Sequence, residues 1–257
     1  MITIKSTKEI DSMREGGRIL AGIMQKIGEA AVPGKNTLEL DKLAEELIFA
    51  SGGTPSFKGY GAETGNPFPA TICASVNSEI VHGLPEAGKI LKAGDVFKVD
   101  IGMKYQGLHT DMARTFAVGE IEDEAVKLIE VTEQCFWEGI KNIGPGNMLS
   151  GYSKAVQKYV ETNGFSVVRN LVGHGVGREL HEDPQVPNYF NKKFQDVRLA
   201  SGMTLALEPM VNAGNFETKL GHDGWTFLTR DGRLSAHYEN TIVITEKGVE
   251  VLTVLDK

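Results

Sequence analysis

The sequence of 257 residues is poor in cysteine and lacks the cysteine spacings that usually carry chemistry. Its two cysteines, Cys73 and Cys135, form neither a C-x-x-C pair nor a zinc-knuckle pattern. A disulfide framework is therefore not expected. Each thiol is first interpreted as a small buried apolar group rather than a nucleophile or a metal ligand.

Long apolar runs and blocks of positive charge are also missing. No stretch of about 18 or more apolar residues occurs, and the start MITIKSTKEI lacks the features of a signal peptide. The formal net charge is −7 without clustered Lys or Arg, which disfavours a general nucleic-acid binder. We therefore predict a cytoplasmic protein that binds neither a membrane nor a specific nucleic acid.

Two families of ligand motif are absent as well. The glycine-rich stretch 173–177 contains neither G-x-G-x-x-G nor G-x-x-x-x-G-K-[ST], so a nucleotide loop is a poor interpretation. His181-Glu182 lacks the histidine at position 185 that a helical H-E-x-x-H zinc site requires. The glycines around His174 instead let the backbone approach some other ligand.

The composition that remains is that of an ordinary globular protein, with 41% hydrophobic and 24% charged residues and no low-complexity tract. We expect one domain over residues 1–257. Caps and apolar spacing predict helices over residues 8–30, from an N-cap at Thr37 to Gly52, and over 122–143 and 150–162. Strands are expected over residues 70–118 and from 165 onward, so helices followed by strands occur twice. This predicts an α+β fold of two similar halves, about 1–119 and 120–257.

Two aspartates occupy a predicted hairpin over residues 95–113. If its loop is Tyr105-Gln106, Asp100 lies directly opposite Asp111, and with the loop at Gln106-Gly107 both still share one face. Like charges so placed destabilise a sheet unless a cation lies between them. The alternatives are that Asp111 opens a turn or that both acids face solvent, and the hairpin alone does not decide.

Single glutamates interrupt two later strands. Glu208 lies within an apolar strand over residues 203–211, where an ionised carboxylate has to be protonated, paired with a base or bound to metal. Glu239 is isolated in the strand over 236–244 and shares a face with His237. Glu208 could instead pair with one of the Lys or Arg residues, and Glu239 could belong to a solvated edge.

These residues gain meaning as a set. His82, His174 and His181 taken singly are more often surface or core residues than ligands. One imidazole and four carboxylates together supply four negative charges, which two divalent cations would neutralise, and oxygen-rich ligation of this kind suits Mn, Fe, Co or Zn. The predicted metal ligands are Asp100, Asp111, His174, Glu208 and Glu239.

The sequence resembles the type I methionine aminopeptidases, which are pita-bread enzymes of peptidase family M24. The resemblance spans nearly the whole chain and is carried by five blocks in the family's order. These are residues 77–85, the 100–111 hairpin, 173–177, Leu207-Glu208-Pro209-Met210, and 235–241.

The resemblance implies a fold of two pseudo-symmetric halves, each with helices covering a curved antiparallel sheet. It also implies that Asp100 binds one metal ion, that His174 and Glu208 bind the other, and that Asp111 and Glu239 bridge both. The site would hold two divalent ions of Co, Mn, Fe, Ni or Zn, and the sequence does not distinguish among these metals.

The implied activity is removal of the initiator methionine from nascent polypeptides whose second residue is small. Hydroxide generated between the two cations would attack the first peptide bond, with Glu208 as the proton shuttle. His82 and His181 would contact the substrate and polarise it. By the same resemblance, Phe68, Cys73 and Trp225 join His82 around the methionine side chain.

The sequence departs from the family's pattern at three places. Leu180 stands where many members carry an aromatic residue, and the stretch Phe57 to Asn66 does not align with their aromatic pocket residues. His237 replaces a frequent Gln, so the environment of Glu239 could differ. A short, bacterial-style form that acts as a monomer, with possible ribosome association, is expected.

Two alternative functions are considered. An X-Pro aminopeptidase or prolidase shares the five ligands but usually carries a separate N-terminal domain. A catalytically inactive relative that binds a partner would lose ligands, whereas this chain has all five.

Overall fold

The structure, a computed structural model, describes residues 2–255. Four α-helices flank the strands, and a 3-10 turn spans Ala62–Thr64. The helices are α1 (Thr7–Ala30), α2 (Thr37–Ala50), α3 (Asp123–Ile140) and α4 (Ser150–Thr162). The strands are β1 (Thr54–Pro55), β2 (Ile72–Val76), β3 (Glu79–Val81), β4 (Asp95–Tyr105), β5 (Leu108–Val118), β6 (Ser166–Val167), β7 (Gly173–Gly175), β8 (Glu182–Val186), β9 (Thr204–Leu207), β10 (Met210–Asn212), β11 (Thr218–Leu220), β12 (Phe227–Thr229), β13 (Ser235–His237), β14 (Glu239–Thr245) and β15 (Gly248–Val251).

All four predicted helices are present, with small changes at their ends. The N-cap of α2 is Asn36 rather than Thr37, because the Asn36 side chain accepts the backbone N–H of Glu39. The buried Thr37 hydroxyl instead contacts the backbone of Glu86. Helix α3 ends at Ile140 and not at position 143.

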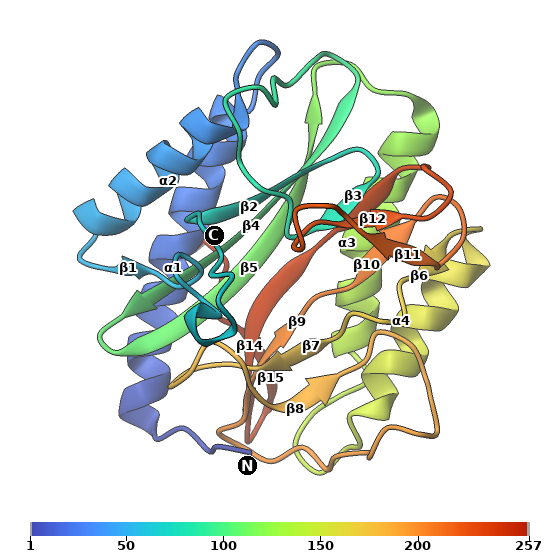
Figure 1. Cartoon of the computed structure of the whole chain (residues 1–257). Helices are drawn as coiled ribbons and strands as arrows, with labels where there is room; N and C mark the ends of the chain where they lie inside the picture. Colours follow the sequence, from blue (N-terminus) through green and yellow to red (C-terminus); the bar gives the residue numbers. More distant parts are fainter. Residues whose placement is uncertain (1, 256–257) are drawn as a thin grey trace.

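One nine-stranded sheet contains strands from both halves of the sequence. Its strands follow the order β1-β4-β5-β14-β9-β7-β8, with β2 paired to β4 and β15 paired to β14. Strand β5 from the first half of the sequence pairs with β14 from the second, as Figure 1 shows at the centre of the molecule. This pairing brings distant parts of the sequence side by side.

Each helix pair covers its own part of this sheet. Helices α1 and α2 lie on one side of the view in Figure 1 and α3 and α4 on the other, with strands between them. One apolar core contains residues of α1, α2, β2, β4 and β5, and a second contains residues of α3, α4, β9 and β14. This arrangement agrees with the predicted α+β class.

The register of the hairpin corrects the first of the two loop placements considered. Gln106 and Gly107 form the turn, and Asp100 pairs with Ala113 while Asp111 pairs with Gly102. Both turn residues have positive φ, 49° at Gln106 and 85° at Gly107, as a type I′ turn requires. The aspartates are therefore diagonal neighbours on one face and not directly opposed.

Both strands that were predicted to contain the glutamates are shorter than predicted. The strand expected over 203–211 breaks at Glu208-Pro209, since Pro209 has no N–H to donate to a ladder. The strand expected over 236–244 breaks at Tyr238. After each break the chain changes sheet: β10 and β13 pair in a separate three-stranded sheet with β6, whereas β9 and β14 stay in the large one. Glu208 and Glu239 thus lie where the chain passes between sheets.

Within residues 2–255, no helix has the length and apolar character that crossing a membrane requires.

Candidate metal centre and substrate pocket

Five adjacent strands of the large sheet each bring one predicted ligand to the same place. In the order β4, β5, β14, β9 and β7, the strands are hydrogen-bonded neighbours. They carry, in that order, Asp100, Asp111, Glu239, Glu208 (directly after its strand) and His174. All five side chains line one cavity. The sheet order therefore converts residues scattered along the sequence into one cluster.

Distances within the cluster suit a shared ion. One donor atom each from Asp111, His174 and Glu239 lies within 4.8 Å of the others, and all three residues are buried. Glu208 Oε1 lies 3.5 Å from His174 Nε2. His174 Nδ1 is 2.8 Å from the carbonyl oxygen of Gly175, to which it donates as N–H, and this leaves Nε2 free to face the carboxylates.

The four carboxyl groups are costly to ionise in this position. Burial raises the pKa of Asp111 to about 7. Burial, followed by repulsion from Asp111, raises the pKa of Asp100 and Glu239 well above their usual range. The pKa of Glu208 is raised by burial and then by the charge of Asp100. Burial also lowers the pKa of His174 to about 3, so this imidazole is neutral, as a metal ligand must be.

The donor set fits divalent cations. Asp100 Oδ1 and Asp111 Oδ1 are buried without a hydrogen-bond partner among the described residues. A buried oxygen without a partner costs free energy unless a hydrogen-bond donor or a cation compensates it, and the surrounding ionised carboxylates are only acceptors. Four carboxylates and one neutral imidazole match first-row divalent metals. The residues present therefore fit a divalent metal centre.

An apolar pocket adjoins the cluster. Its cavity has a volume of about 100 Å³ and shares its lining with the carboxylates, so it is continuous with them. Phe68 packs edge-on against Trp225 with ring centroids 5.2 Å apart, and Cys73 lies opposite Asp100 in the β2–β4 register. These two aromatic rings form an apolar part of the cavity lining, and the Cys73 thiol lies where this part meets the acids.

Two histidines flank the space between the pocket and the cluster. His82 is half-buried against Trp225 and Phe227 and has a positive φ of 58°. His181 packs edge-on against His174 at 4.3 Å, and its Nδ1 is 2.6 Å from the hydroxyl of Tyr60. Loss of surrounding water as the chain packs around the rings lowers the pKa of both imidazoles to about 4, although His181 remains partly open to solvent, so each is a neutral donor at neutral pH.

The Tyr60 contact is compatible with a His181 tautomer that carries its proton on Nε2. Burial raises the pKa of Tyr60, so its hydroxyl keeps its hydrogen. When that O–H donates to Nδ1, the imidazole proton is on Nε2 and can be donated to a ligand.

Two aromatic residues of this pocket were not predicted from the sequence. Phe57 and Tyr60 line it together with Leu180, and all three come from the places where the sequence departs from the family's pattern. Phe57 and Tyr60 belong to an aromatic-rich stretch with neighbouring glycines. The contact between Tyr60 and His181 could not be predicted from this stretch, because the two residues are 121 positions apart in the sequence. At the third departure, His237 Nε2 is 3.9 Å from both Glu208 Oε2 and Glu239 Oε2, and neither ring nitrogen hydrogen-bonds to another described residue.

A wider groove leads away from the cluster. Its volume is about 760 Å³, and it shares His82, His174, His181 and Glu208 with the smaller pocket. Its outer part is polar and includes Arg178 together with Glu179, Glu182 and Gln185. A ligand with one apolar end and an extended polar remainder fits the two cavities together.

Comparison with known proteins agrees with this geometry. The sequence profile of metallopeptidase family M24 matches residues 11–246. Fold and donor set thus define a metal-dependent peptidase that uses a divalent ion.

Individual relatives show which group of metal-dependent peptidases this chain resembles. A methionine aminopeptidase of Clostridium perfringens is 50% identical over 99% of this chain and 100% of its own. The crystal structure of methionine aminopeptidase from Thermotoga maritima, 44% identical, superposes with a TM-score of 0.94 over 99% of this chain and 100% of that chain. The chain therefore belongs to the methionine aminopeptidases of metallopeptidase family M24.

A more distant neighbour shares the fold alone. An Xaa-Pro dipeptidase from Bacillus anthracis is 23% identical with a TM-score of 0.78, and the match covers 99% of this chain but 62% of that one. The predicted pita-bread fold is confirmed by these neighbours.

Proposed function

We propose that this chain is a metalloaminopeptidase that releases the initiator methionine from nascent polypeptides whose second residue is small. The observation that carries the proposal is the continuity of the apolar pocket with a buried cluster of metal donors. The full-length likeness to methionine aminopeptidases supports it.

We assign the metal centre two divalent cations. Asp100 would hold one, His174 and Glu208 the other, and Asp111 and Glu239 would bridge them. Two cations would balance the four negative charges that burial otherwise makes costly. Bound between them, water would become acidic enough to supply a nucleophile near neutral pH.

The remaining chemistry belongs to side chains. Glu208 would accept the proton of the attacking water and deliver it to the departing amine, since it lies in both the pocket and the groove. His181 would donate from Nε2 to the substrate peptide group, and His82 would do so from the opposite wall. Both are neutral at working pH, so they polarise the carbonyl without adding a charge that would repel the cations.

Specificity would follow from the cavity walls. The methionine side chain would occupy the space beside Phe68, Cys73 and Trp225, where sulfur–aromatic contact adds to apolar burial. The second residue would lie between His82 and His181, where the passage to the groove leaves room for a small side chain. The groove would hold the rest of the peptide.

We further propose that the chain acts as a monomer in the cytoplasm on polypeptides leaving the ribosome. The ligands, the pocket and the groove all come from one chain, so no second copy is required to complete the site. Sedimentation of the purified protein should give a species of 27.9 kDa.

Peptide hydrolysis tests the proposal. Protein stripped of metal and reloaded separately with Co, Mn, Fe, Ni or Zn would be given Met-Ala-Ser, Met-Leu-Ser and Ala-Pro-Ser. Release of methionine from the first peptide, much slower release from the second and no cleavage of the third are expected. Preference for Ala-Pro-Ser would indicate an X-Pro aminopeptidase, and no cleavage with any ion would indicate an inactive relative.

A further inference from the structure

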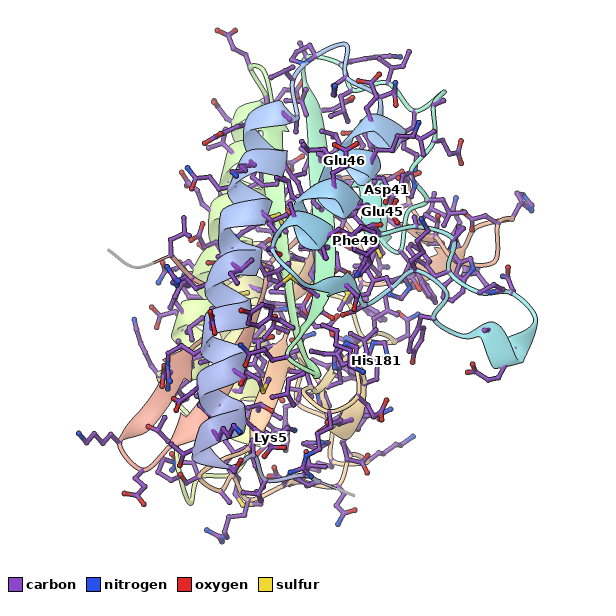
Figure 2. The ribbon with its side chains drawn as sticks, turned by 90° about the vertical axis from the view of Figure 1, so that its left-hand side faces the viewer. Lys5, Asp41, Glu45, Glu46, Phe49 and His181 are labelled. Carbon is purple, nitrogen blue, oxygen red and sulfur yellow. The ribbon has the colours of Figure 1, made fainter. Side chains whose placement is uncertain are left out.

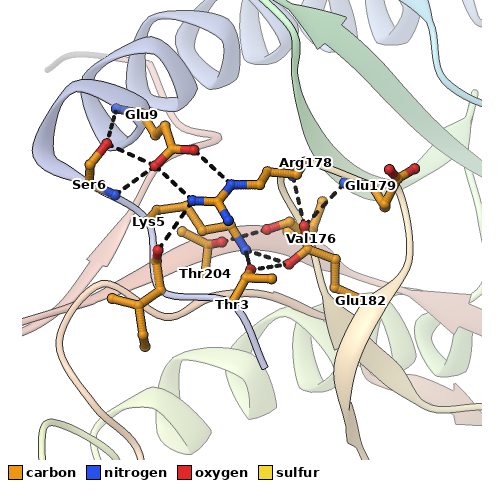
Figure 3. Close-up of polar contacts among 10 residues, drawn as sticks. Thr3, Lys5, Ser6, Glu9, Val176, Arg178, Glu179, Glu182 and Thr204 are labelled. Carbon is orange, nitrogen blue, oxygen red and sulfur yellow. Dashed lines mark hydrogen bonds and ion pairs between the residues drawn. The ribbon is translucent and has the colours of Figure 1, made fainter. Parts of the chain in front are cut away.

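A buried ion pair ties the start of the chain to the loop that carries His181. Lys5 Nζ lies 2.5 Å from Glu182 Oε2, and the two side chains are 1% and 5% exposed. Thr3 donates its hydroxyl to the same Glu182 oxygen and accepts from Lys5. Figure 3 shows these contacts between the N-terminal segment (residues 3–9) and the histidine loop (residues 176–182).

The other oxygen of Glu182 organises the loop itself. Oε1 accepts the backbone N–H of Arg178 at 2.7 Å and that of Glu179 at 3.1 Å. One carboxylate therefore closes the turn on one side and binds the N-terminal segment on the other. Leu180 and His181, which line the substrate pocket, lie inside this closed turn.

Further contacts hold the N-terminal segment against the loop. A Cβ added at Gly177 would lie 2.4 Å from Lys5 Cε, so the lysine stem packs directly on the loop backbone. The Lys5 backbone N–H donates to the carbonyl of Gly202 at 2.8 Å. The Arg178 guanidinium reaches Glu9 at 2.8 Å across the exposed rim of the same contact.

Apart from the loop backbone, the His181 ring has two neighbouring side chains that contact it among the described residues. It is exposed and is held by Tyr60 on one side and by the ring of His174 on the other. Tyr60 is itself 42% exposed, on the stretch before the pocket. Figure 2 places Lys5 at the foot of α1 and His181 further up the molecule, on the loop that the ion pair anchors.

We propose that Lys5 is a positioning residue, which acts through Glu182 to fix the histidine loop and so sets the orientation of His181 towards substrate. This inference rests on the proposed function for its catalytic consequence. The structural part of the inference, that Lys5 orders the histidine loop, is independent of the proposed function.

Substitution of Lys5 by Met, which keeps the stem and removes the charge, tests the proposal in fully metal-loaded protein. We expect kcat/KM for Met-Ala-Ser to fall by about tenfold or more. The upper bound is ~100-fold, which is the loss in rate that a 1 Å misplacement of a catalytic group can cause. Metal affinity measured by calorimetry should not change, because no ligand is touched. Lys5→Arg should restore most of the loss. Arg14→Met, which removes a different ion pair of α1, to Glu250, serves as the matched control and should leave kcat/KM unchanged.

Two readouts separate positioning from a general structural effect. In a His181→Ala background, Lys5→Met should cause no further loss of turnover. Hydrogen exchange of the Arg178 and Glu179 amides should be faster in Lys5→Met than in the wild type, with or without metal. If Lys5→Met does not fold, Thr3→Val removes one donor to Glu182, and the same comparisons apply to it.

Three results would overturn the inference: unchanged exchange and kcat/KM in Lys5→Met, losses that multiply with His181→Ala, or a parallel loss of metal affinity. A wild-type protein that does not cleave Met-Ala-Ser would instead refute the proposed function. The exchange measurement would still decide whether Lys5 orders the loop.

Discussion

Removing the metal should leave a protein whose stability falls as the pH rises, and Asp111 gives the size of the effect. The pKa of Asp111 is raised by burial from 3.8 to about 7 in the metal-free fold. Between these pH values the folded state keeps a proton that the unfolded state has released. Raising the pH therefore favours unfolding.

The magnitude follows from the pKa difference of about three. At about 1.4 kcal/mol for each pKa unit, the free energy of unfolding loses about 4 kcal/mol in all, of which roughly 3 kcal/mol lies between pH 5 and pH 8. Folded domains are stable by about 5–15 kcal/mol, so this loss is measurable. The pKa values of Asp100, Glu208 and Glu239 are raised as well, and each acts in the same direction.

Urea unfolding of chelator-treated protein at pH 5, 6, 7 and 8 measures this dependence. Asp111→Asn cannot ionise at this position and should make the fall in stability with pH less steep, whereas Glu246→Gln, at an exposed turn, serves as the control. With saturating divalent metal the slope should reverse, because the ligands bind as anions. A metal-free wild type equally stable at pH 5 and pH 8, or an Asp111→Asn variant with the wild-type slope, would show that burial of Asp111 does not cause this pH dependence.

Three further predictions concern turnover and packing. Glu208→Gln should lower kcat for Met-Ala-Ser by about 10²- to 10⁴-fold without unfolding the protein, since it removes the proton shuttle; normal hydrolysis would exclude that role. Phe68→Leu should raise KM about tenfold with a smaller change in kcat, because the pocket wall recedes from the methionine side chain; steady-state kinetics decide, and an unchanged KM would place that side chain elsewhere. Gly17→Ala should destabilise the fold by about 1–3 kcal/mol, because its Cβ would lie 2.4 Å from the carbonyl oxygen of Leu252. Gly22→Ala, whose nearest contact is 3.9 Å away, should be neutral or stabilising in the same thermal unfolding experiment.

Local sequence signals predicted the helices and the hairpin because their causes are local. The capping box at Ser6 and Glu9 is present, and the glycine at position 107 favoured the turn that formed. The misplaced N-cap at Thr37 has the same origin, because two adjacent residues were both good caps and only tertiary contact with Glu86 distinguishes them.

The sequence predicted which four acidic residues and which histidine form the candidate metal centre, but it did not predict how the fold brings them together. Their convergence depends on the strand order β4-β5-β14-β9-β7, in which neighbours are far apart in the sequence. Alternation within a single strand also failed at Tyr238, where the chain changes sheet. Tyr60 and Lys5 were missed for a related reason, since each acts through a partner more than 120 residues away.

Anomalous diffraction from crystals soaked in Mn²⁺ would locate the metal ions bound by this chain. The proposed two-metal centre predicts two peaks about 3.5–4 Å apart, with Asp111 and Glu239 bridging them and the Phe68 pocket opening beside them. Absence of bound metal at this cluster, or ions held by other side chains, would contradict it.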